Sequence, residues 1–104
     1  ASCLVGSEMC IRDRTFAGVP YPLALEAVEH IRKLVPGDAS MAQFALRWIL
    51  MEEGVSTVIP GARNATQAIA NTAAAELAPI SPQVMSELRA LYREMIAPHV
   101  HHLW

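Results

Sequence analysis

The stretch Ser56–Asn71, which reads S-T-V-I-P-G-A-R-N-A-T-Q-A-I-A-N, constrains the fold of this chain more than any other. The β-branched, apolar run at 55–59 predicts a short strand, and Pro60-Gly61 ends it in a tight turn. Asn64 is a favourable N-cap, so a helix is predicted directly after it. The strand shows too little alternation for one wet face, which is typical of a parallel sheet covered by helices. The pattern therefore indicates an α/β unit.

The turn into this helix carries groups that suit an anion. The first N–H groups of a helix have no intrahelical acceptor, and the helix dipole is positive at that end. Arg63 adds a charge and a planar guanidinium that fits phosphate. Gln67 stands at the third helical position, where it forms a variant of the capping box with Asn64. Because Asn71 follows one turn later on the same face, we predict a phosphate site with two amides beside it, which suits a nucleotide.

Amphipathic or apolar patterns predict further helices at residues 23–35, 41–53 and 65–75, and from 82 to about 95, with Pro98 beyond the last helix. Ser40 with Gln43, and Ser81 before a proline, are predicted helix starts, and Gly54 is a predicted left-handed C-cap. Helix 41–53 is apolar nearly all round, so it should lie between a sheet and other helices. Its inner stripe is expected to be Phe44, Ala45, Trp48 and Ile49. Arg47 is expected to have a packing role rather than a catalytic one.

Composition bounds the function. Of the 104 residues, 53% are hydrophobic and 17% charged, so we expect some apolar surface to meet another molecule or chain segment. The net charge of −2, without a basic cluster, gives no support for nucleic-acid binding. No apolar run approaches the roughly 18 residues that span a membrane, and no signal-peptide pattern is present, so a cytoplasmic protein is expected. Three of the four histidines lie at 99–102, but no thiolate or carboxylate stands near them in sequence, so no metal site is expected.

Residues 3–14, C-L-V-G-S-E-M-C-I-R-D-R, resemble a translated sequencing adaptor fused to a truncated gene. The resemblance implies that residues 1–14 are not native and that the natural protein continues upstream. It gives Cys3, Cys10 and Arg12 no functional role. Residues 15–104 then form the remaining part of the chain, with no further domain boundary.

Residues 15–104 resemble the C-terminal part of an aldo-keto reductase of bacterial type. The resemblance rests on A-L-R-W-I-L at 45–50, on V-S-T-V-I-P-G-A-R at 55–63, on Gln67 and Asn71, and on the tail I-A-P-H-V-H-H-L-W. It implies the last β/α unit of a (β/α)8 TIM barrel with flanking helices, mostly helical in this chain. It also implies NADP(H) as cofactor and reduction of aldehydes and ketones.

The resemblance further implies roles for five residues. Gly61, Ala62 and Arg63 lie along the adenosine 2′-phosphate, with Arg63 as its main cation. Gln67 stands beside that phosphate and the ribose, and Asn71 is at the adenine edge. Where another branch of the family has a lysine this motif has a glycine, which shifts phosphate binding onto Arg63 and backbone donors.

The family's catalytic aspartate, tyrosine, lysine and histidine have no counterparts here, so no catalytic residue is assigned. The parent protein is expected to be an NADP-dependent oxidoreductase that acts on a small carbonyl compound, and the 104-residue chain alone is expected to be inactive. Two alternatives remain open. One is a small helical binding module with no enzyme parent, and the other is a non-catalytic subunit that binds NADPH.

Overall fold

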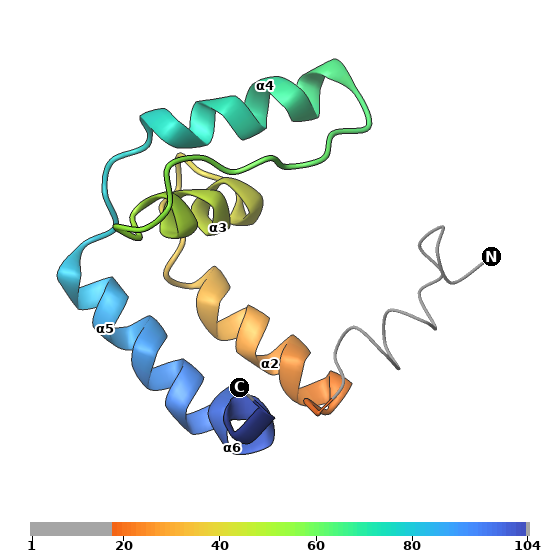
Figure 1. Ribbon diagram of the computed structural model, residues 1–104, viewed down its shortest axis with the longest axis vertical. Helices are drawn as coiled ribbons and strands as arrows, with labels where there is room; N and C mark the ends of the chain where they lie inside the picture. The colour runs from red at the N-terminus through yellow and green to blue at the C-terminus, as the bar shows by residue number, and fades with distance from the viewer. Residues whose placement is uncertain (1–17, 104) are drawn as a thin grey trace. The chain divides into compact units, whose positions relative to one another are not determined.

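The computed structural model describes residues 18–103, and the regular secondary structure of these residues is helical (Figure 1). Residues 1–14, with Cys3, Cys10 and Arg12, lie outside the described part, so nothing in it bears on the predicted adaptor segment. In chain order the elements are α2 (Tyr21–Arg32), α3 (Met41–Leu50), α4 (Ala65–Ala73), the 3-10 turn η3 (Ala74–Glu76), α5 (Pro82–Leu91), the π-helical η4 (Tyr92–Ile96), α6 (Ala97–Val100) and the 3-10 turn η5 (His101–Leu103).

The chain divides into two compact units, and the predicted nucleotide segment lies wholly within one of them, Leu34–Met85. In this unit α3 packs against α4 and η3. Its buried core consists of Phe44, Ala74 and Ile80, and Ala74 has no exposed surface at all. The other unit combines α2 with the C-terminal helical turns, and α2 contacts η4 there. Ala27 is its buried core residue.

The predicted strand at 55–59 is wrong, because residues 18–103 contain no strand. The backbone N–H of Val55 bonds to the carbonyl of Glu52 at 2.9 Å, within a turn. The segment that follows has no neighbouring strand with which to exchange hydrogen bonds, and a strand forms only when such a neighbour is present. Ile59 was expected to be buried in a sheet that helices cover on both faces, but it is 95% exposed. The mostly helical character that was predicted is confirmed.

The predicted helix starts are confirmed by their caps. The hydroxyl of Ser40 accepts a 3.1 Å bond from the N–H of Gln43, and the Gln43 side chain accepts a 3.0 Å bond from the N–H of Ser40. The hydroxyl of Ser81 accepts a bond from the N–H of Val84 at 3.3 Å. These are local bonds, so the sequence spacing alone was enough to predict them.

The predicted helix ends are less accurate. Helix α2 ends at Arg32 and α3 at Leu50, each three residues earlier than predicted. Gly54 is not a left-handed cap, because Gly18 is the one residue with positive φ in the described chain, at +94°. Pro98 lies inside α6 rather than beyond the last helix. It is tolerated there because it stands in the first turn, where a missing N–H breaks no helical bond.

The predicted inner stripe of α3 is correct only for Phe44, because Ala45, Trp48 and Ile49 are exposed. Phe44 is 4% exposed, whereas Trp48 is 48% and Ile49 is 36% exposed. Helix α3 contacts helices but no sheet in the described residues, so the face that the sheet should cover remains open. No helix in residues 18–103 combines the length and apolarity needed to cross a membrane.

Candidate functional site

Helix α4 begins directly after Asn64, as predicted. Asn64 has extended backbone geometry, with φ −154° and ψ 169°, and its side-chain oxygen accepts a 2.9 Å bond from the N–H of Gln67. Its carbonyl accepts the first intrahelical bond, from the N–H of Ala68 at 3.2 Å. This cap uses one of the orphan donors at the helix start and fixes the direction from which the chain enters α4.

The reciprocal half of the predicted capping box is displaced by one residue. The side-chain oxygen of Gln67 accepts a 2.7 Å bond from the N–H of Arg63, not from that of Asn64. Gln67 therefore holds the backbone of the arginine that was predicted to bind phosphate. Its side-chain NH2 group has no partner in residues 18–103.

Asn71 forms a second tie between α4 and the turn. Its side-chain N–H donates to the carbonyl oxygen of Gly61 at 3.1 Å, across ten residues of sequence. Gly61 and Arg63 precede α4 in the chain, and each is bonded to an amide side chain on α4. The start of α4 lies at the upper right of Figure 1. The structure therefore brings Gly61, Ala62, Arg63, Gln67 and Asn71 together around one turn.

The unpaired groups at this turn include a cation and hydrogen-bond donors. Residues 61–69 are all exposed. The guanidinium of Arg63 forms no hydrogen bond or ion pair within residues 18–103, and the N–H groups of Ala65 and Thr66 have no acceptor there. No Asp or Glu occurs between Val55 and Ala75 in the sequence. A negatively charged ligand would meet a free cation and free helix donors at this turn.

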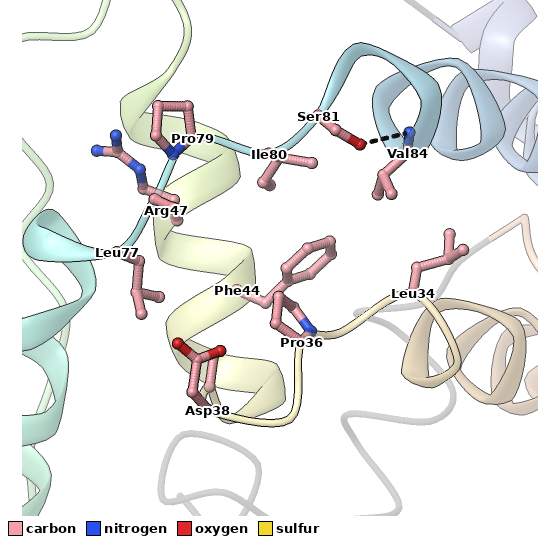
Figure 2. Close-up of a pocket in the computed structure, with 12 residues that line it drawn as sticks. Leu34, Pro36, Asp38, Phe44, Arg47, Leu77, Pro79, Ile80, Ser81 and Val84 are labelled. Carbon is pink, nitrogen blue, oxygen red and sulfur yellow. Dashed lines mark hydrogen bonds between the residues drawn. The ribbon is translucent and has the colours of Figure 1, made fainter.

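A separate apolar pocket lies in the same unit, and none of the five predicted site residues lines it (Figure 2). Its volume is about 270 Å³, and it is formed between the start of α3 and the segment before α5. The lining residues are Leu34, Pro36, Asp38, Ala39, Phe44, Arg47, Leu77, Ala78, Pro79, Ile80, Ser81 and Val84. Sequence reasoning missed this pocket because its walls come from two segments some thirty residues apart, with no shared motif.

Residues 18–103 contain no group of three or more His, Cys, Asp or Glu side chains that could hold a metal ion. Within the C-terminal histidine run, the Nδ1 atom of His101 lies 3.0 Å from the hydroxyl of Tyr92, and the two rings meet edge to face. His101 is thus engaged in a tertiary contact within its own unit.

Comparison with protein families identifies a match that covers most of the chain. The model of the Aldo/keto reductase family matches residues 6–93, which include the whole of the turn and α4. The match begins inside residues 1–14, so the origin of that segment stays a prediction. Neither the curated proteins nor the solved structures gave a match.

Proposed function

This chain belongs to the aldo/keto reductase family, a family of oxidoreductases, and we propose that residues 61–71 bind the adenosine 2′-phosphate end of NADP(H). The observation that carries the proposal is the unpaired guanidinium of Arg63, beside two free helix N–H groups, on a turn whose shape is fixed by Gln67 and Asn71. A phosphate monoester is the ligand that such a turn fits best, since guanidinium and backbone donors both favour its oxygens.

In this proposal the five residues have two kinds of role. Arg63 is the cation that faces the 2′-phosphate. A Cβ atom at Gly61 would meet nothing within 4 Å, so packing does not require glycine there, and its absence leaves room for a ligand to approach the backbone of Gly61 and Ala62. Gln67 and Asn71 hold the turn with one end of each amide, and each has its other end available for the ribose or the adenine edge.

We further propose that residues 15–104 are the C-terminal part of a (β/α)8 barrel that transfers hydride from NADPH to a carbonyl group. The segment 55–59 would then be the last barrel strand, and its partner strands would come from the rest of the protein. The proposal accounts for two observations: the segment has the sequence of a strand but has no partner strand in the described residues, and Ile59 is exposed.

The test compares NADPH with NADH, which differ at the 2′-phosphate. Arg63→Ala should weaken NADPH binding by roughly 10- to 150-fold, because a charge-assisted hydrogen bond contributes about 1.5–3 kcal/mol. NADH binding should hardly change. Affinities are measured on the 104-residue chain by isothermal titration calorimetry. Arg89→Ala, which removes an exposed arginine from α5, is the matched control. An equal loss for both cofactors would exclude the 2′-phosphate role.

A second candidate is a non-catalytic binding module, and the exposed Trp48 and Ile49 on α3 favour it, since such side chains suit a protein partner. An activity assay on this chain does not distinguish the enzyme fragment from the binding module, because the catalytic residues of the family have no counterparts in the chain. Purified residues 1–104 should therefore oxidise no NADPH above the blank with any aldehyde. Recovery of the upstream reading frame separates them. A barrel-length frame with the four catalytic residues supports the enzyme, and a natural start near residue 15 supports the module.

A further inference from the structure

We propose that Gln43 is a positioning residue for the candidate cofactor turn, although it lies on a different helix and forms no hydrogen bond to any of the five residues of that turn. Gln43 acts through α4. The inference rests on the proposed function for its effect on a ligand, but its structural part, the control of Asn71 and Gly61, stands independently of any ligand.

The side chain of Gln43 is bonded at both ends. Its oxygen accepts the N–H of Ser40 at 3.0 Å, within the capping box of α3. Its NH2 group donates to the carbonyl oxygen of Ala70 at 3.0 Å, a part-buried bond across 27 residues of sequence. A glutamine in a cap needs only its oxygen. The second bond is therefore additional to the cap and fastens the start of α3 to α4.

The carbonyl oxygen of Ala70, which accepts the bond from Gln43, lies next to a residue of the candidate cofactor turn. The carbonyl of Ala70 belongs to the peptide group that it shares with Asn71, and Asn71 is the residue whose side chain holds the carbonyl of Gly61. Three successive bonds thus lead from Ser40 to the turn: Ser40 to Gln43, Gln43 to Ala70, and Asn71 to Gly61.

A second attachment holds the 3-10 turn η3, which follows α4 directly. Arg47, one helical turn after Gln43, donates from Nη1 to the carbonyl of Ala75 at 3.3 Å. Ala74, between the two acceptors, is fully buried, and its small side chain permits the close approach of α3 that both bonds need. The continuous segment formed by α4 and η3 is therefore held at two points, one in each element, so the amide groups of Gln67 and Asn71 meet the turn in one orientation.

The loss of the Gln43–Ala70 bond should let α4 shift against α3 and should loosen the Asn71–Gly61 bond. Gln43→Glu keeps an oxygen for Ser40 and removes the donor to Ala70. Because a new carboxylate would stand one turn from Arg47, Gln43→Met is the uncharged companion. Ser40→Ala is the matched control, since it weakens the same capping box but leaves the bond to Ala70 in place.

Two measurements on the 104-residue chain test the inference, with helix content checked by circular dichroism. The first, by NMR without ligand, is the exchange rate of the Asn71 side-chain NH2 and the position of the Gly61 and Arg63 amide signals. Both Gln43 variants should speed that exchange and move those signals, whereas Ser40→Ala should not. The second is the affinity for adenosine 2′,5′-bisphosphate by calorimetry, which both Gln43 variants should weaken roughly 2- to 12-fold, the effect of one net hydrogen bond.

The outcomes separate this inference from the proposed function. If the unmodified chain does not bind the bisphosphate but the Asn71 signals respond to Gln43, the cofactor proposal fails and the positioning role holds. If the Gln43 variants and Ser40→Ala change the Asn71 signals equally, or none of them does, the positioning role is overturned. If both Gln43 variants bind the bisphosphate as tightly as the unmodified chain does, the proposed effect of Gln43 on ligand binding is overturned.

Discussion

The side-chain amide of Asn71 donates a 3.1 Å hydrogen bond to the carbonyl oxygen of Gly61, ten residues earlier in the chain. The bond joins the second turn of α4 to the loop that leads into it. With the shorter bond from the N–H of Arg63 to Gln67, it shapes the loop from the helix side and leaves the outward side to solvent. A ligand would therefore meet a turn whose backbone is already ordered, at a lower entropic cost.

Asn71→Leu, which keeps the size of the side chain and removes its donor, should lower the free energy of unfolding by about 0.5–1.5 kcal/mol, the net contribution of one hydrogen bond. The amide signals of Gly61 and Ala62 should move. Thr72→Ala is the control, because Thr72 donates only within α4, to the carbonyl of Ile69 at 2.8 Å. Equal movement of the Gly61 signal in both variants would contradict a specific Asn71–Gly61 contact.

Asn64→Ala should cost about 1 kcal/mol of helix stability, because the N–H of Gln67 loses its capping acceptor. Asn64→Asp keeps an acceptor and should preserve stability, but its charge would stand beside Arg63 and repel a phosphate. The expected pattern is therefore a split: the alanine variant loses stability in urea unfolding, and the aspartate variant loses NADPH affinity. Normal NADPH affinity in the aspartate variant would indicate that the ligand does not approach this end of α4.

Gly18 and Gly54 should respond to alanine in opposite directions. Gly18 has φ +94°, and a Cβ atom there would lie 3.1 Å from Cγ1 of Val100 and 3.2 Å from the carbonyl oxygen of His99. Gly18→Ala should therefore destabilise the chain by about 1–2 kcal/mol. Gly54 lacks positive φ and has open space around it, so Gly54→Ala should stabilise by about 0.4–1 kcal/mol. Thermal unfolding measures both effects. If Gly54→Ala destabilised the chain, Gly54 would have the left-handed conformation that the sequence predicted.

Phe44→Ala should destabilise the unit that contains α3 more than Trp48→Ala does, although tryptophan is the larger side chain. Phe44 is 4% exposed and Trp48 is 48% exposed, so truncation leaves a cavity only at Phe44. Buried Phe→Ala changes cost about 3–5 kcal/mol, and the neighbouring pocket should place this one near the lower value. Urea unfolding followed by circular dichroism ranks the two variants. The reverse ranking would mean that α3 buries its tryptophan face instead.

The features that the sequence predicted well are those that depend on neighbours in sequence. Ser40, Asn64 and Ser81 were predicted as caps, and each accepts the bond that its position requires. The placement of Gln67 and Asn71 beside the turn that carries Arg63 was also predicted, because helical spacing puts the two amides on one face and Arg63 directly precedes the helix cap.

The features that the sequence predicted poorly depend on distant partners. The apolar pattern of 55–59 describes a strand only if other strands lie beside it, and none does in the described chain. The same lack of a sheet leaves Trp48 exposed although its spacing matched that of Phe44. The bond from Gln43 to Ala70 could not be predicted either, since it joins residues 27 apart that share no motif.

The exposed, unpaired segment that leads into α4 has a consequence for proteolysis. Proteases bind their substrates as extended, accessible chain, and Arg63 ends such a stretch at a bond that trypsin accepts. Arg47, Arg89 and Arg93 lie within helices, which must unwind before they are cut, whereas Lys33 lies in the exposed turn after α2 and is a second accessible site. The Arg63–Asn64 bond should therefore be an early cleavage point, and a nucleotide seated on the turn would shield it. The rate of the cut at Arg63, compared with that at Lys33, then reports occupancy of the turn without a label or an assay of turnover.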